Sequence, residues 1–181
     1  MSKIGRRPID LGNVQIEING QEVHYKGKKD SGVHALPEGL QAELVDNKKI
    51  KILCDDKESR ESKRLWGLHR ALLANEIKGA DQGFEKQLNI TGLGYKAAVS
   101  GDKLIFSLGY SHKIEFPLPK GISVDIDKKG QTLKVSGSDK ERVGAVCSEI
   151  KALRPPEPYK GTGIQLSDET ILRKAGKTKS A

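Results

Sequence analysis

The stretch from residue 154 to 164, which reads RPPEPYKGTGI, carries residue types suited to binding a phosphate-rich partner. Its prolines fix the backbone and end the helical pattern that precedes them. A mobile lysine neutralises phosphates, tyrosine offers a flat stacking face, and glycines let bare backbone come close. The binding candidates are Arg154, Tyr159, Lys160, Gly161, Thr162 and Gly163. The same composition is typical of a purely structural Pro/Gly turn that follows a helix. The rest of the sequence must therefore decide between a binding loop and a structural turn.

Residues that could catalyse a reaction are present, but their spacing forms no catalytic pattern. The histidines fall on different predicted elements: His24, His34, His69 and His112. Asp55 and Asp56 directly precede a predicted helix, where carboxylates commonly cap backbone N–H groups. The Gly92-Leu93-Gly94 turn is followed by a strand, whereas a dinucleotide-binding loop would open a helix. We predict no catalytic residue, no metal, no cofactor and no small-molecule substrate.

That glycine turn instead presents Tyr95 and Lys96, which we add to the binding candidates. Whether Tyr95 stacks on an unpaired base or packs inside a sheet stays open at this point. Two other classes of function also stay open. The Pro155-x-x-Pro158 spacing could suit an SH3-type groove of a partner protein, and Asp55 and Asp56 with a histidine could belong to a small enzyme.

The distribution of charge indicates a polyanionic partner. The 32 lysines and arginines and 24 acidic residues give a formal net charge of +8. Residues 1–81 hold 15 basic and 13 acidic side chains, a net charge of +2, while residues 82–181 hold 17 and 11, a net charge of +6. The second half therefore carries most of the field that would attract phosphates. Structured RNA is favoured over duplex DNA because no recognition helix is evident.

Cysteine usage and hydropathy indicate a reducing, cytosol-like compartment. Cys54 and Cys147 are too few and too far apart for a disulfide framework or a metal knuckle, so we expect both to be reduced and buried. The N-terminus has no apolar core of a signal peptide, and no apolar run is long enough to span a membrane. We predict no membrane partner.

The two halves repeat one order of elements. Alternating apolar residues predict several short strands in each half, followed by a helix that starts near Ser59 in the first half and near Ser138 in the second. In the first helix we expect Leu65, Leu68, Leu72 and Leu73 to share one face up to Ile77, and Gly79 to end it. The sequences Leu36-Pro37-x-Gly39 and Leu118-Pro119-x-Gly121 match at a spacing of 82 residues. We infer an internal duplication.

The predicted fold class is α+β, with two tandem duplicated domains that each pack one helix on one face of a small antiparallel sheet. We expect a basic N-terminal arm over residues 1–8, and its candidate RNA contacts are Lys3, Arg6 and Arg7. The repeats span residues 9–81 and 82–164. A basic C-terminal tail, residues 165–181, should be disordered in isolation. Its candidate RNA contacts are Arg173, Lys174, Lys177 and Lys179.

Several of these segments together resemble one protein family. RPPEPYKGTGI and the duplicated LPxG units resemble the large-subunit ribosomal proteins of the sixth family, in the bacterial or organellar form. The resemblance covers nearly the whole chain. It includes GFEKQLNITGLGYKAAV at residues 83–99, LGYSH at residues 108–112 and RKAGK at residues 173–177.

The resemblance implies a structural constituent of the large ribosomal subunit that performs no catalysis. It implies binding to large-subunit rRNA near the stalk base and the translation-factor site, beside the sarcin-ricin loop, with neighbouring ribosomal proteins as partners. Residues 154–164 match the family's signature loop, so Tyr159, Lys160, Gly161 and Gly163 would be RNA contacts. Thr162 departs from the family, which usually has a second lysine there, although its hydroxyl could still donate a hydrogen bond. The expected location is the cytoplasmic ribosome, with an organellar ribosome left open.

Overall fold

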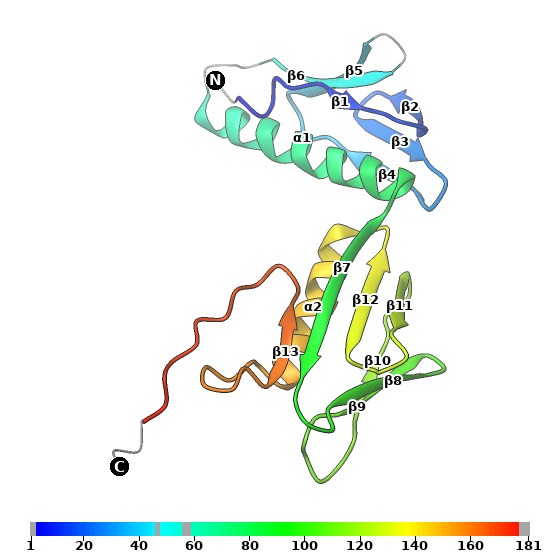
Figure 1. Ribbon diagram of the computed structural model, residues 1–181. Helices are drawn as coiled ribbons and strands as arrows, with labels where there is room; N and C mark the ends of the chain where they lie inside the picture. The colour runs from blue at the N-terminus through cyan, green and yellow to red at the C-terminus, as the bar shows by residue number, and fades with distance from the viewer. Residues whose placement is uncertain (1–2, 46–47, 56–58, 178–181) are drawn as a thin grey trace. The chain divides into compact units, whose positions relative to one another are not determined.

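The computed structural model describes residues 3–45, 48–55 and 59–177, which divide into two compact units (Figure 1). The first unit comprises Met1–Gly83 and Ser138–Lys140, and the second comprises Phe84–Gly137 and Glu141–Ala181. The boundary that the sequence places between residues 81 and 82 stays a prediction.

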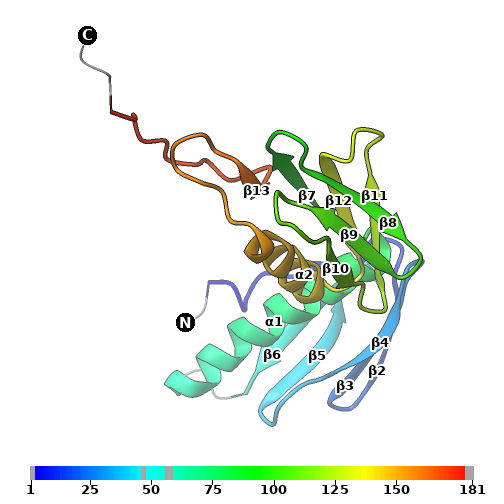
Figure 2. The same cartoon turned by 90° about the horizontal axis from the view of Figure 1, so that it is seen from below.

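The described residues of the first unit form two small antiparallel sheets and one long helix. One sheet has the order β1-β6-β5, and the other has the order β2-β3-β4. The elements are β1 (Ile9–Asp10), β2 (Gln15–Asn19), β3 (Glu22–Lys26), β4 (Ser31–Ala35), β5 (Leu40–Val45), β6 (Lys49–Cys54) and α1 (Arg60–Asp81). Figure 2 shows α1 lying beside β6 and β5, and α1 contacts both β6 and β1.

The second unit repeats this plan and adds one strand. Its sheets have the orders β10-β9-β8 and β11-β12-β7-β13. The elements are β7 (Phe84–Thr91), β8 (Lys96–Ser100), β9 (Lys103–Ser107), β10 (Ile114–Pro117), β11 (Ile122–Ile126), β12 (Thr132–Gly137), α2 (Lys140–Leu153) and β13 (Gly163–Leu166).

The sheet orders show the duplication directly. The order β7-β12-β11 in the second unit corresponds to β1-β6-β5 in the first, and β8-β9-β10 corresponds to β2-β3-β4. The described strand pairs are antiparallel. The α+β fold class with two duplicated units is therefore confirmed. The structure refines it, because each unit holds two small sheets where the sequence predicted one.

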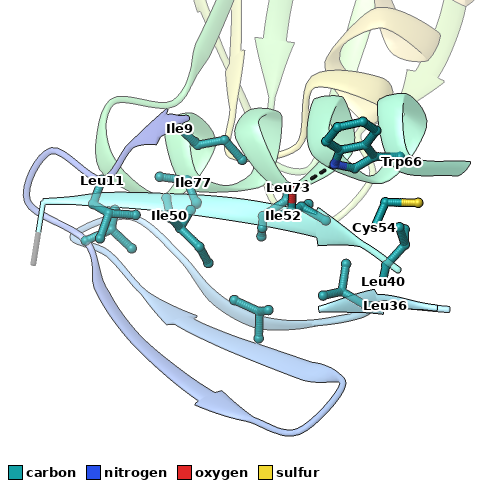
Figure 3. Close-up of a cluster of buried hydrophobic side chains, with 13 residues drawn as sticks. Ile9, Leu11, Leu36, Leu40, Ile50, Ile52, Cys54, Trp66, Leu73 and Ile77 are labelled. Carbon is teal, nitrogen blue, oxygen red and sulfur yellow. Dashed lines mark hydrogen bonds between the residues drawn. The ribbon is translucent and has the colours of Figure 1, made fainter. Parts of the chain in front are cut away.

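The face of α1 that packs on the core differs from the predicted leucine face. Leu73 is fully buried, whereas Leu68 and Leu72 are 48% and 39% exposed. The core side of the helix carries Trp66, Leu73 and Ile77 (Figure 3). This set and the leucine set both have helical spacing, so periodicity alone could not choose between them. The Trp66 Nε1–H donates to the Ile52 carbonyl over 2.8 Å and thereby fixes the helix to β6.

The predicted end of α1 at Gly79 is also wrong. Gly79 is buried inside the helix, which continues to Asp81. Gln82 and Gly83 then donate their N–H groups to the Lys78 carbonyl, and Gly83 takes the left-handed φ of +77° that commonly follows a helix.

Candidate nucleic-acid interface

The signature loop is closed by its own backbone. It connects α2 to β13, a strand without a counterpart among the described residues of the first unit. The N–H of Gly161 donates to the Glu157 carbonyl over 2.9 Å, and the N–H of Glu157 donates to the Thr162 carbonyl over 2.9 Å. The N–H of Ile164 donates to the Arg154 carbonyl over 2.8 Å where β13 begins. The loop therefore has a defined shape before any partner binds.

Gly161 and Gly163 of the loop are both buried, and other parts of the chain approach the backbone of each glycine closely. A Cβ atom on Gly163 would lie 2.7 Å from the Pro155 carbonyl oxygen. A Cβ atom on Gly161 would lie 2.8 Å from a guanidinium nitrogen of Arg173. The two glycines thus allow close packing within the loop and against Arg173 of the tail. Tyr159 and Lys160 remain exposed at the tip of the loop.

The start of the C-terminal tail lies against the signature loop. The N–H of Lys174 donates to the Pro158 carbonyl over 2.9 Å. Further back, Lys151 Nζ donates to Glu169 over 2.7 Å, and this hydrogen bond holds the pKa of the Glu169 carboxyl below its usual value. The predicted disorder of the tail is therefore wrong for this segment, because local composition could not show its contacts with the loop. Lys177 is exposed, and Lys179 lies outside the described residues.

Arg154 lies beside Tyr110, which sequence reasoning did not assign to the site, and also interacts with Tyr95, which it did. Its guanidinium carbon lies 4.9 Å from the centroid of the Tyr110 ring. The Tyr110 hydroxyl donates to the Leu153 carbonyl over 3.3 Å, and the His112 ring stacks on Tyr110 at 6.0 Å between centroids. The pKa of Arg154 is raised above its usual value, by Tyr110 first and by Tyr95 to a smaller extent. The LGYSH run was the signal that could have found Tyr110.

The Tyr95 side chain packs partly against the core of the second unit. It fills the space beside Gly92 and Gly109 and stays partly exposed. This contact supports the packing alternative that the sequence left open. Lys96 next to it is exposed.

The Thr162 hydroxyl has a partner within the loop. Its Oγ1–H donates to a carboxylate oxygen of Glu157 over 3.2 Å. The hydrogen bond that this hydroxyl could have given to a phosphate therefore goes to Glu157 in this structure. Thr162 itself adds no positive charge to the loop.

The arm residues Lys3, Arg6 and Arg7 belong to the first unit and are exposed. The structure therefore carries candidate contacts on both units. The candidates from residues 154–174 and from Tyr95 and Lys96 belong to the second unit.

Histidines and cysteines also occur outside this site, and the structure gives their surroundings. Among the described residues, no group of three or more histidine, cysteine or acidic side chains could hold a metal ion. His34 Nδ1 lies 2.9 Å from Glu76, and His34 Nε2 lies 3.1 Å from His69 Nδ1, so both ring nitrogens of His34 have partners within the unit. Cys54 and Cys147 are buried, as predicted, and burial raises the pKa of Cys147.

Within the part of the chain that the structure describes, neither helix combines the length and the apolar character needed to cross a membrane. Lysines, arginines and tyrosines displayed around a preformed loop are typical of a nucleic-acid-binding protein.

Comparison with known proteins identifies the family within that class. The family model for ribosomal protein L6 matches residues 91–166, which include most of the second unit and the whole signature loop. The chain is 41% identical to large ribosomal subunit protein uL6 of Helicobacter hepaticus, 45% identical to that of Methylacidiphilum infernorum and 46% identical to that of Rippkaea orientalis, each over 179 residues. Each match covers 98% of both chains.

The protein belongs to the uL6 family of large ribosomal subunit proteins. The resemblance found in the sequence is thereby confirmed. As a member of this family, the chain is a structural constituent of the large subunit in the cytoplasmic ribosome, and it is not an enzyme.

Proposed function

We propose that this chain binds large-subunit rRNA through the signature loop and the docked start of the tail, and that it stabilises the local fold of the RNA. The proposed place is near the stalk base and the translation-factor site, beside the sarcin-ricin loop. Stalk-base and other large-subunit proteins would be neighbours there, and translation factors would bind close by. Family membership and the greater positive charge of the second half support this assignment.

The docking of the tail on the loop is the observation that carries the proposal. Through this contact Arg173 and Lys174 join Lys160 and Arg154 around one short turn. Glu157 is the acidic residue within the loop itself, and its carboxylate accepts the Thr162 hydroxyl. Closely spaced cations suit the phosphates of folded RNA, and a backbone that is already ordered loses less entropy on binding.

The proposed contacts predict a measurable salt dependence. A Lys160→Gln/Lys174→Gln variant removes two exposed charges while leaving the backbone hydrogen bond of Lys174 in place. If each lysine contacts one phosphate, the slope of log affinity against log salt for a bacterial large-subunit rRNA transcript should become less steep by about 1.4–1.8. The measurement is a filter-binding titration over a series of salt concentrations.

Lys120 provides a matched control for Lys160. Both are exposed lysines that directly precede a glycine in a proline-containing turn of the second unit. Lys120→Gln should leave the salt slope unchanged. An equal slope for the double variant and the parent would overturn the proposed contacts, and binding that resists high salt would favour the protein-adaptor alternative for Pro155 and Pro158.

A further inference from the structure

The N-terminal arm is bound to the first half of α1. Gly5 is buried, and a Cβ atom on it would lie 2.5 Å from the Trp66 ring. Arg70 donates from Nε to the Arg7 carbonyl over 3.0 Å and from Nη2 to the Pro8 carbonyl over 2.9 Å. These contacts use the backbone of the arm, so its basic side chains stay exposed. The sequence could not show that the arm has a fixed place on a helix.

The helix adds its own cations to those of the arm. Arg60 and Arg64 are exposed and lie one turn apart, and Lys63 lies two turns before Arg70 on the same side of the helix. We call the set the arm–helix surface; it consists of Lys3, Arg6, Arg7, Arg60, Lys63 and Arg64.

Charge in the first 81 residues is concentrated at this surface. Residues 3–8 and 60–70 hold seven basic side chains and one acidic side chain, Glu61, a net charge of +6. The other residues up to 81 hold eight basic and twelve acidic side chains, a net charge of −4. The low net charge of the first half therefore conceals a strongly basic surface, which becomes evident only because the arm docks on α1.

The arrangement favours phosphates over an acidic protein. Leu68 and Leu72, which are exposed, lie two residues before and after Arg70 and hence on nearly the opposite side of the helix. Lys63 and Arg70 lie on the side that holds the arm, and Arg60 and Arg64 lie between that side and Leu68. Protein interfaces usually centre on apolar and aromatic anchors, whereas the RNA backbone is bound through charge.

We propose that the arm–helix surface is a second RNA contact, which binds the sugar-phosphate backbone of large-subunit rRNA at nucleotides different from those near the signature loop. This inference rests on the proposed function in one respect, that the chain binds this RNA. It assigns a binding role to the first unit and names three helix residues, Arg60, Lys63 and Arg64, that sequence reasoning did not single out.

Hydroxyl-radical footprinting of a bacterial large-subunit rRNA transcript tests the inference with the full chain. The variant Arg60→Gln/Arg64→Gln removes two exposed guanidinium groups, and Lys26→Gln/Lys28→Gln is its matched control. The control residues flank Gly27, which contacts Ala80. Ala80 is 20 residues, or about 30 Å of helix, from Arg60.

The expected result is loss of one protected segment in the arginine variant, with the segment that depends on Lys160 and Lys174 retained. The salt slope should become less steep by about 1.4–1.8 in the arginine variant and stay unchanged in the control. An arginine variant with the parental footprint and slope would overturn this inference and leave the signature loop as the RNA contact. Absence of any protection by the parent chain would instead overturn the proposed function. Circular dichroism verifies that each variant is folded.

Discussion

Replacing Gly163 with alanine should strongly destabilise the second unit, because its surroundings are backbone atoms. The residue has a φ of +141°, which side-chain-bearing residues rarely adopt. The new Cβ atom would lie 2.7 Å from the Pro155 carbonyl oxygen and the Pro156 Cα, and 2.9 Å from the Arg154 carbonyl oxygen. None of these atoms can rotate away, so the start of β13 must shift.

The magnitude follows from two contributions. An unfavourable backbone conformation costs about 1–3 kcal/mol, and overpacking costs about 1–3 kcal/mol. We expect Gly163→Ala to lower the free energy of unfolding by about 2–6 kcal/mol, the sum of these contributions and a large share of the roughly 5–15 kcal/mol of a typical domain. Gly161→Ala should cost less on steric grounds, because its close neighbour is the end of the Arg173 side chain, which can move.

Gly144 supplies the matched control. It lies inside α2, and a Cβ atom there would meet no other atom within 4 Å. Gly144→Ala should stabilise the protein by about 0.5–1 kcal/mol, because alanine loses less backbone entropy in a helix. Urea denaturation followed by far-ultraviolet circular dichroism measures both changes. A Gly163→Ala variant as stable as the parent would refute the account of the loop, as would equal destabilisation by both substitutions.

Three further predictions concern the first unit. Trp66→Phe removes the donor to the Ile52 carbonyl and should lower the free energy of unfolding by about 1–3 kcal/mol in urea denaturation; an unchanged value would contradict the role of this hydrogen bond. Burial, with His34 as a smaller cause, lowers the pKa of His69 below 6.5. The unfolded chain then binds the proton more readily, so the stabilising contribution is present above pH 6.5 and is lost as the pH falls through the folded pKa. In denaturation at a series of pH values, the free energy of unfolding of His69→Gln should depend less on pH below 6.5 than that of the parent. Identical curves for variant and parent would contradict the lowered pKa of His69. Burial, with Glu76 second, raises the pKa of Tyr25 from 10.0 to about 12, so its stabilising contribution is complete below pH 10 and is lost as the pH rises through 12. The phenolate absorbance that Tyr25→Phe removes should titrate near pH 12, and titration near 10 would disprove the shift.

The duplication and most strands were predictable because their signals are local. Alternating apolar residues and the LPxG turn segments are each recognised from a few neighbouring residues in the sequence. The strand β13 was missed because its four residues form a strand only by pairing with β7, more than 70 residues earlier in the chain. Its formation depends on a partner that no local pattern reveals.

The residues of the candidate site could be predicted from the sequence, but the contacts between them could not. Proline, glycine and lysine residues indicated the signature loop, and the family resemblance named candidate contacts among them. The position of Arg154 beside Tyr110 joins residues 44 apart in sequence, and the docking of Lys174 on Pro158 depends on the folded loop. The same holds for Arg70 and the arm, where one side chain fixes two carbonyl groups.

Sucrose-gradient sedimentation of a cell lysate tests most directly the claim that this chain is a structural constituent that binds RNA through clustered cations. The account predicts that the tagged full chain sediments with the large subunit, and that Lys160→Gln/Lys174→Gln is released at a lower salt concentration than the parent, whereas Lys120→Gln is not. Recovery of the parent chain among free proteins at the top of the gradient would contradict the account.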